Sequence, residues 1–255
     1  MQINLGYDDI GLENEETIIL IGGLATQRTV WPNNFCQSLN NNKFRVIRFD
    51  NRDIGESSYF EENKKTNLES LVKKSLMGEK IIPPYTLSDM ANDTINLINK
   101  LSLDKVHIVG MSMGARIGQV IAKKQSSSIR SLTSIMTTSG APNLPQGKKE
   151  AIDAITQKPK DEFNIDDLIE LSIMQQKVIG SPKYPISEEY IQQVVKLNYI
   201  RGNNPKGVLR QWLASQCEGD QTDSLLKIKL PVLVIHGKND PLIPYESGLD
   251  VANKI

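Results

Sequence analysis

One serine in this chain has the neighbours that a nucleophilic hydroxyl needs. Residues 110–114 read Gly-Met-Ser-Met-Gly, which places Ser112 within the spacing G-x-S-x-G. A short apolar stretch at 105–109 precedes this motif, and a helix-compatible stretch at 115–124 follows it. A serine at such a strand-to-helix turn exposes its hydroxyl, and the flanking glycines leave room for a strained backbone. The pattern predicts a nucleophile at Ser112; the alternative is a tight turn with an idle serine.

The residue after this serine could also contribute to chemistry. The backbone N–H of Met113 is expected at the start of the following helix. An N–H at that position, helped by the helix dipole, can stabilise a negative charge that develops on a carbonyl oxygen under attack. Ser112 and Met113 together therefore indicate acyl-transfer chemistry.

Buried parallel strands must position this motif, because several short apolar runs alternate with helical patterns. Residues 87–101 repeat apolar side chains at helical spacing, and Thr86 to Asp89 opens them like a capping box. Strands that alternate with helices favour an α/β fold with an open sheet. The predicted strands are 17–21, 45–49, 106–109, 131–136 and 231–235.

The alternation stops between residues 142 and 222, where prolines separate several helical patterns and no convincing buried strand is found. This segment is predicted to be a helical cap, inserted into a core made of residues 1–141 and 223–255. Such a cap would shape a pocket and exclude water from it. The polar stretch 59–84 is predicted to be either a mobile lid or a long connection.

Composition narrows the class of protein. Of the 255 residues, 39% are hydrophobic and 24% charged, with 30 basic and 30 acidic side chains. A net charge near zero gives no attraction to nucleic acid or to an anionic membrane, so neither is expected as a partner. The two cysteines form no metal-ligand pattern, and no signal peptide or membrane-length apolar run is present. We expect a cytoplasmic protein with no metal and no cofactor.

Six motifs in order along almost the whole chain, G-x-S-x-G among them, make the sequence resemble the α/β-hydrolase superfamily. Within that superfamily, it is similar to bacterial esterases of the aclacinomycin methylesterase type. The motifs besides G-x-S-x-G are the strand and glycine pair at 18–24, the strand and D-x-R-x-x-G-x-S turn at 44–57, the helix start at 84–91, the strand at 131–136, and the strand and acidic loop at 231–244.

The resemblance implies a mostly parallel sheet with helices on both faces and a helical cap. It implies Ser112 as the nucleophile, Asp240 as the acid, and the backbone N–H groups of Leu24 and Met113 as oxyanion donors. Leu24 follows two glycines, which let the backbone approach closely. The alternative acids are Asp220 and Asp223, and the alternative for Asp240 is a turn-forming residue before a proline.

The general base is the part that the sequence does not supply. The chain has two histidines, His107 inside a predicted strand and His236 at the end of another, and both are expected to be structural. The resemblance places the base well after Asp240, beyond one more strand. We therefore expect that the chain as given lacks the last strand, the catalytic histidine and the last helix of the fold.

The sequence thus predicts a serine hydrolase that cleaves a small or medium carboxylic ester through an acyl-enzyme on Ser112, impaired in this 255-residue form. Carbon–carbon bond hydrolysis, lactone opening and perhydrolysis on the same serine remain open. A non-catalytic binding protein with the same fold also remains open. A small-molecule ester is the expected partner, while its identity and the oligomeric state stay undetermined.

Overall fold

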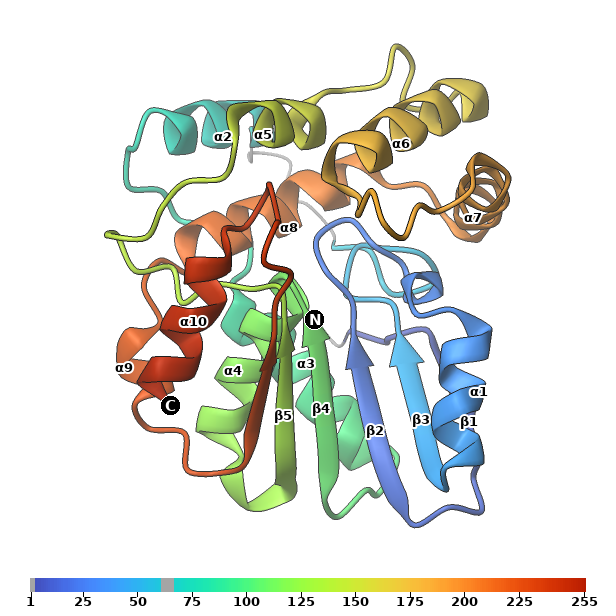
Figure 1. The fold of residues 1–255 in the computed structure, drawn as a ribbon, viewed down its shortest axis with the longest axis vertical. Coiled ribbons are helices and arrows are strands. Elements are labelled where there is room, and N and C mark those ends of the chain that lie inside the picture. The colour runs from blue at the N-terminus through green and yellow to red at the C-terminus, as the bar shows by residue number, and fades with distance from the viewer. Residues whose placement is uncertain (1–2, 61–66) are drawn as a thin grey trace.

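A six-stranded sheet forms the centre of the molecule (Figure 1). The computed structural model describes residues 3–60 and 67–255. The strands lie in the order β1-β3-β2-β4-β5-β6; β1 is antiparallel to β3, and every other neighbouring pair is parallel. Their bounds are β1 Tyr7–Ile10, β2 Glu16–Ile21, β3 Phe44–Phe49, β4 Val106–Met111, β5 Ile129–Ile135 and β6 Val232–Ile235.

The five predicted strands correspond to β2 through β6, and the mostly parallel sheet is confirmed. β1 was not among the predicted strands, because its sequence Tyr-Asp-Asp-Ile is not an apolar run. Charge pairs with β3 hold it instead. Asp8 opposes Arg48 in the register and accepts a hydrogen bond from its Nε at 2.8 Å, and Asp9 accepts one from the Nε of Arg45, also at 2.8 Å.

Helices cover the two faces of the sheet unequally. α3 (Leu87–Lys100) and α4 (Met113–Lys124) supply the main apolar core with β2, β3, β4 and β5, and the predicted capping box of Thr86 and Asp89 opens α3. On the opposite face, α1 (Asn33–Asn41) packs against β3 and β1. The remaining elements near the sheet are the 3-10 turns η1 (Arg28–Val30) and η2 (Ser126–Ser128), and the helices α9 (Thr222–Leu225) and α10 (Tyr245–Lys254). Helix α2 (Leu68–Leu76) lies above the strands (Figure 1).

Four of the five helices between β5 and β6 form a separate layer above the carboxyl ends of the strands (Figure 1). They are α5 (Lys149–Thr156), α6 (Ile165–Ile179), α7 (Glu188–Arg201) and α8 (Pro205–Cys217), and we refer to them as the α5–α8 layer. Residues 142–222, all described, contain no strand. The predicted lid or connection at 59–84 includes α2, which packs against α8, and also residues 61–66, which lie outside the described residues.

Buried ion pairs join this layer to the sheet. Asp53, which follows β3 and is fully buried, bonds Arg210 of α8 through both carboxylate oxygens, at 2.8 and 2.9 Å. The hydroxyl of Tyr85 donates to the same carboxylate at 2.8 Å. Burial raises the pKa of Tyr85, so its hydroxyl keeps the proton that it donates. Within the residues that the structure describes, none of the helices is long and apolar enough to cross a membrane.

Replacing Arg210 by methionine should destabilise the fold strongly, because it leaves the fully buried carboxylate of Asp53 without its cation. Loss of one partner from a buried pair costs about 3–5 kcal/mol. The free energy of unfolding in urea measures this cost. The control Lys177→Met breaks an exposed pair with Glu188 and should change stability by about 1 kcal/mol or less. If the two variants lowered the free energy of unfolding equally, the buried Asp53–Arg210 pair would not be the stronger contribution to stability that we expect.

Candidate active site

Ser112 lies at a strained turn between β4 and α4. Its backbone adopts φ 52° and ψ −122°, a conformation that residues other than glycine rarely adopt. Two hydrogen bonds hold it there: its N–H donates to the carbonyl of Ile135 at 2.9 Å, and its own carbonyl accepts from the hydroxyl of Thr137 at 2.9 Å. Ser112 is the N-cap residue of α4, yet its side chain makes no capping bond, which leaves the hydroxyl available for chemistry.

The two glycines of the motif are required by close backbone contacts. A Cβ on Gly114 would lie 2.3 Å from the carbonyl oxygen of Ile21, and a Cβ on Gly110 would lie 2.4 Å from the carbonyl oxygen of Gly114. Neither distance is possible for a real side chain. The end of β2 and the first turn of α4 therefore touch through their backbones.

The loop that follows β2 also lies against the serine. A Cβ built on Gly23 would be 3.4 Å from the Cβ of Ser112 and 3.9 Å from its Oγ. Leu24 comes next and is half-buried against the main core. Met113 is the first residue of α4, where helix N–H groups have no partner within the helix. The structure thus brings three of the predicted site segments together: the serine, the loop containing Leu24, and the start of α4.

Asp240 lies in the loop after β6, and its side chain organises that loop. One carboxylate oxygen accepts the N–H groups of Leu242 and Ile243, each at 2.9 Å, and the other lies 3.5 Å from Nε2 of His236. Asp240 and Ser112 both follow the carboxyl ends of parallel strands, and therefore lie at the same edge of the sheet. Their strands, β6 and β4, are separated by β5, and the hydrogen bonds of Asp240 go to its own loop rather than to Ser112. The alternative acid Asp220 is exposed; the hydroxyl and N–H of Thr222 donate to it and lower its pKa.

Both histidines have partners away from the serine. Nε2 of His236 donates to the carbonyl of Ile243 at 2.8 Å, and its ring packs against Gly248 of α10. Nδ1 of His107 lies 2.7 Å from the hydroxyl of Ser131, and its Nε2 lies 3.4 Å from a Glu16 oxygen. His107 is five residues before Ser112 along β4, roughly 16 Å away at the rise of a strand. β6 lies two strands from β4, roughly 10 Å.

Sequence reasoning missed the polar residues that hold the loop after β2. The N–H of Ala25 donates to Oε1 of Gln211 in α8 at 3.1 Å, and Nε2 of Gln27 donates to two carbonyls at the end of α7. These partners lie more than 170 positions apart in the sequence. No local pattern indicates such a pairing, and only the fold reveals it.

Replacing Ser112 by glycine should stabilise the protein, because glycine adopts this backbone conformation without strain. We expect the free energy of unfolding to rise by about 1 kcal/mol, the strain relieved less the extra chain entropy of glycine. Replacement by alanine should leave the strain in place and give no such gain. Urea unfolding of the three proteins measures the difference, and a glycine variant less stable than the alanine variant would contradict it.

Comparisons with known proteins agree with this architecture. The family model for the alpha/beta hydrolase fold matches residues 16–255. Rhodomycin D methylesterase DauP of Streptomyces sp. (strain C5) is 21% identical over 272 residues, which cover 100% of this chain and 85% of the relative. The putative carbamate hydrolase RutD of Caulobacter sp. (strain K31) is 22% identical over 95% of this chain and 80% of its own length.

Solved structures show the same fold. A thermophilic esterase from Thermogutta terrifontis superimposes with a TM-score of 0.67 at 24% identity, covering 99% of this chain and 82% of its own. The enol-lactonase from Burkholderia xenovorans LB400 gives a TM-score of 0.64 at 19% identity, covering 98% of this chain and 84% of its own. With a strained serine after β4, a glycine loop against it, and a family model that spans most of the sequence, this chain belongs to the alpha/beta hydrolase fold family.

Proposed function

We propose that this protein is a serine hydrolase that acts on a small or medium carboxylic ester through an acyl-enzyme on Ser112. The observation that carries the proposal is the position of that residue: its hydroxyl makes no capping bond, and Gly23 and the start of α4 lie beside it. A nucleophile next to backbone N–H groups is the arrangement that acyl transfer needs.

In the proposed reaction, Oγ of Ser112 attacks the ester carbonyl carbon and loses its proton to a general base. The N–H groups of Leu24 and Met113 stabilise the oxyanion. The carbon–oxygen bond to the alcohol then breaks, the alcohol leaves with a proton from the base, and the acyl group remains on Ser112. Water hydrolyses this ester by the same steps, and Asp240 orients the base.

One further finding supports an ester substrate: the similar proteins include methylesterases and an esterase. The α5–α8 layer lies above the carboxyl ends of the strands, and we propose that residues 142–222 act as a cap over the site.

We also propose that the 255-residue form is impaired, since both of its histidines are bonded away from Ser112. The same observation favours a second candidate function, a non-catalytic protein that binds small molecules. Rate enhancement falls by orders of magnitude when a triad member is lost, and what remains comes from the oxyanion donors and binding.

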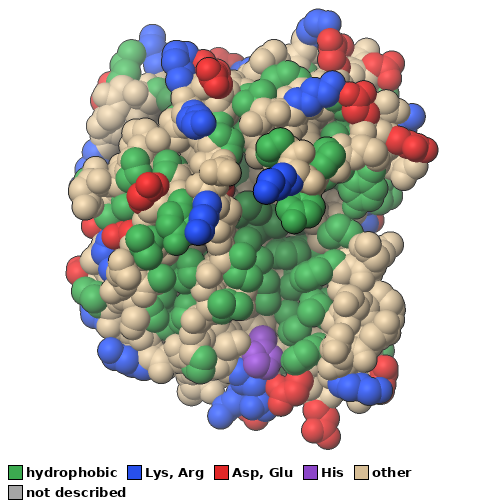
Figure 2. Space-filling model, in the orientation of Figure 1, with side chains coloured by type: hydrophobic (Ala, Val, Ile, Leu, Met, Phe, Trp, Pro, Cys, Tyr) green, Lys and Arg blue, Asp and Glu red, His purple; other side chains and the backbone are tan. Residues whose placement is uncertain are grey.

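The open side of the sheet supports the proposal that the last strand and helix of the fold are lacking. β6 pairs only with β5 among the described strands. On the sheet face opposite α4, β6 presents Leu233 and Ile235, which are 56% and 47% exposed. Figure 2 shows apolar side chains gathered over the middle of the molecule on the face viewed. A strand beside β6 and a helix across this face would cover them, and such a unit could carry the histidine.

The esterase proposal is tested with p-nitrophenyl butyrate. Intact-mass analysis should show slow accumulation of a butyryl adduct on the 255-residue protein, because hydrolysis of the adduct also needs the base. The adduct should be absent from Ser112→Ala and present in Ser128→Ala. If neither the ester nor a fluorophosphonate labels Ser112, the nucleophile proposal fails and the binding-protein candidate is favoured. Rapid turnover that depends on Ser112 would instead overturn the proposed impairment.

The open face is tested by stability. Leu233→Gln should lower the free energy of unfolding by about 1 kcal/mol or less, because more than half of that side chain already faces water. The matched control, Leu132→Gln, changes a fully buried leucine of the neighbouring strand on the covered face and should cost more than about 3 kcal/mol. A cost at Leu233 as large as that at Leu132 would show that the face is covered.

A further inference from the structure

We infer that the α5–α8 layer fixes the loop after β2 in the shape that directs the Leu24 N–H toward Ser112, and that Gln27, Arg201 and Gln211 are positioning residues for this oxyanion donor. The inference rests on the proposed function for the role of the loop. The contacts that hold the loop are independent of that role.

The first contact fixes the residue next to Leu24. Ala25 has φ 61°, in the left-handed region that alanine rarely adopts. Its N–H donates to Oε1 of Gln211 at 3.1 Å, while Nε2 of Gln211 donates to the carbonyl of Arg52 at 2.8 Å. Gln211 is fully buried. This side chain therefore ties a strained loop residue to the segment after β3.

The second contact is made by Gln27, two residues further along. Its Nε2 donates to the carbonyls of Asn198 and Gly202, at 2.7 and 2.9 Å, and its Oε1 accepts from Nε of Arg201 at 3.0 Å. Gln27 is 6% exposed, and its three partners are half-buried. These three bonds join the loop to the end of α7. The hydroxyl of Thr29 adds a bond to Oδ1 of Asn198 at 2.5 Å.

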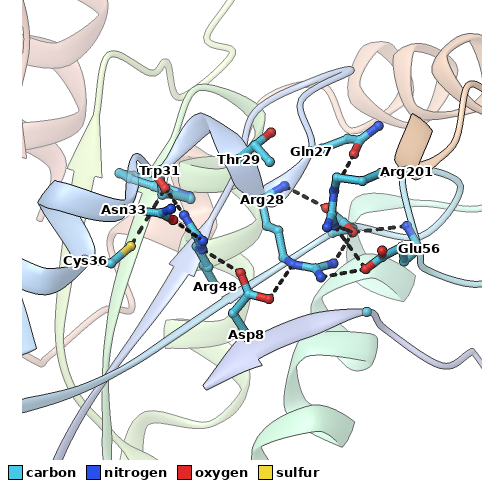
Figure 3. Close-up of polar contacts among 12 residues, drawn as sticks. Asp8, Gln27, Arg28, Thr29, Trp31, Asn33, Cys36, Arg48, Glu56 and Arg201 are labelled. Atoms are coloured by element: carbon cyan, nitrogen blue, oxygen red, sulfur yellow. Dashed lines mark hydrogen bonds and ion pairs between the residues drawn. The ribbon is translucent and has the colours of Figure 1, made fainter. Parts of the chain in front are cut away.

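A buried carboxylate joins these contacts to the sheet. Figure 3 shows the side chains of Arg28, Glu56 and Arg201, which point toward one another. Asp50 follows β3 and is fully buried. Its Oδ1 accepts the backbone N–H of Arg28 at 2.7 Å, and its Oδ2 lies 2.8 Å from Nη2 of Arg201. Glu56 lies 3.2 Å from the same nitrogen of Arg201. The carboxylate of Asp50 thus bonds both the loop after β2, at Arg28, and the end of α7, at Arg201.

Leu24 therefore lies between two fixed points. On one side, Gly23 packs against Ser112; on the other, Ala25 and Gln27 are bonded to the α5–α8 layer. A cavity of about 190 Å³ lies beside Ala25 and Gln27, so side-chain packing does not replace these bonds there. Displacement of a reacting or stabilising group by about 1 Å can lower a rate 100-fold. The bonds from α7 and α8 consequently decide whether the Leu24 N–H is a useful donor.

The test uses hydrogen–deuterium exchange of the full chain. Gln27→Met keeps the side chain's length and removes all three of its bonds, and should speed exchange of the amides of residues 24–29 at least about 10-fold, with the strands unchanged. Thr29→Val removes a single hydrogen bond and should speed exchange less than Gln27→Met does. Thr29→Ser keeps the hydroxyl, so its amides should exchange as slowly as those of the unsubstituted protein. The matched control is Gln175→Met, which breaks an amide–carbonyl bond within the α5–α8 layer at 3.1 Å and does not contact the loop.

A second readout separates positioning from a purely structural role. In single-turnover acylation by p-nitrophenyl butyrate, Gln27→Met should lower the limiting rate about 100-fold and change the half-saturating concentration less than about twofold. Thr29→Ser should retain the rate that Thr29→Val loses. Unchanged exchange at 24–29 in both Gln27→Met and Thr29→Val would overturn the inference, as would an equal rate loss in Gln175→Met. Failure to acylate the unsubstituted protein would refute the proposed function alone, and the exchange data would still decide the inference.

Discussion

The backbone contact between the end of β2 and the first turn of α4 is the constraint on which the rest of the site depends. Gly114 meets the carbonyl of Ile21 with no space for a Cβ, and Gly23 meets the side chain of Ser112. This contact bends the chain at Ser112 into a conformation that costs about 1–3 kcal/mol. It also places the loop after β2 and the N-terminus of α4 on the two sides of one hydroxyl.

Buried charge is the second organising element, and it lies after β3 rather than at the serine. Asp50 and Asp53 are fully buried, and each binds an arginine of the α5–α8 layer, Arg201 and Arg210 respectively. Asp50 also pairs with Arg28 of the loop after β2, whereas the cation bonded to Asp53 is Arg210. Because a buried carboxylate without its cation is costly, the Asp53–Arg210 pair is the stronger constraint on the position of the layer relative to the sheet. Because the same layer bonds Ala25 and Gln27, its position and the shape of the loop beside Ser112 are set together.

The parts of the fold that could be predicted are those that local sequence encodes. Apolar runs predicted the buried strands, and Thr86 with Asp89 predicted the start of α3. The glycine spacing predicted the turn at Ser112. β1 was not predicted, because charge pairs rather than apolar side chains hold it against β3. The hydrogen bond between Ala25 and Gln211 could not be predicted for another reason. Its partners are 186 positions apart, and a glutamine in a sequence does not indicate which group it will bond.

The site is physically uneven across the sheet. Ser112, the proposed nucleophile, lies beside β2, β3 and β4, which have strand neighbours on both sides, and the backbone around it is densely hydrogen-bonded. Asp240, the proposed acid, follows β6, an edge strand among the described strands, with half-exposed apolar side chains. One carboxylate oxygen of Asp240 accepts hydrogen bonds from two loop N–H groups, and the other lies near His236. These contacts fix the orientation of the Asp240 carboxylate, so under the proposed function an imidazole that approached from the open edge would meet an acid and a serine that are already oriented.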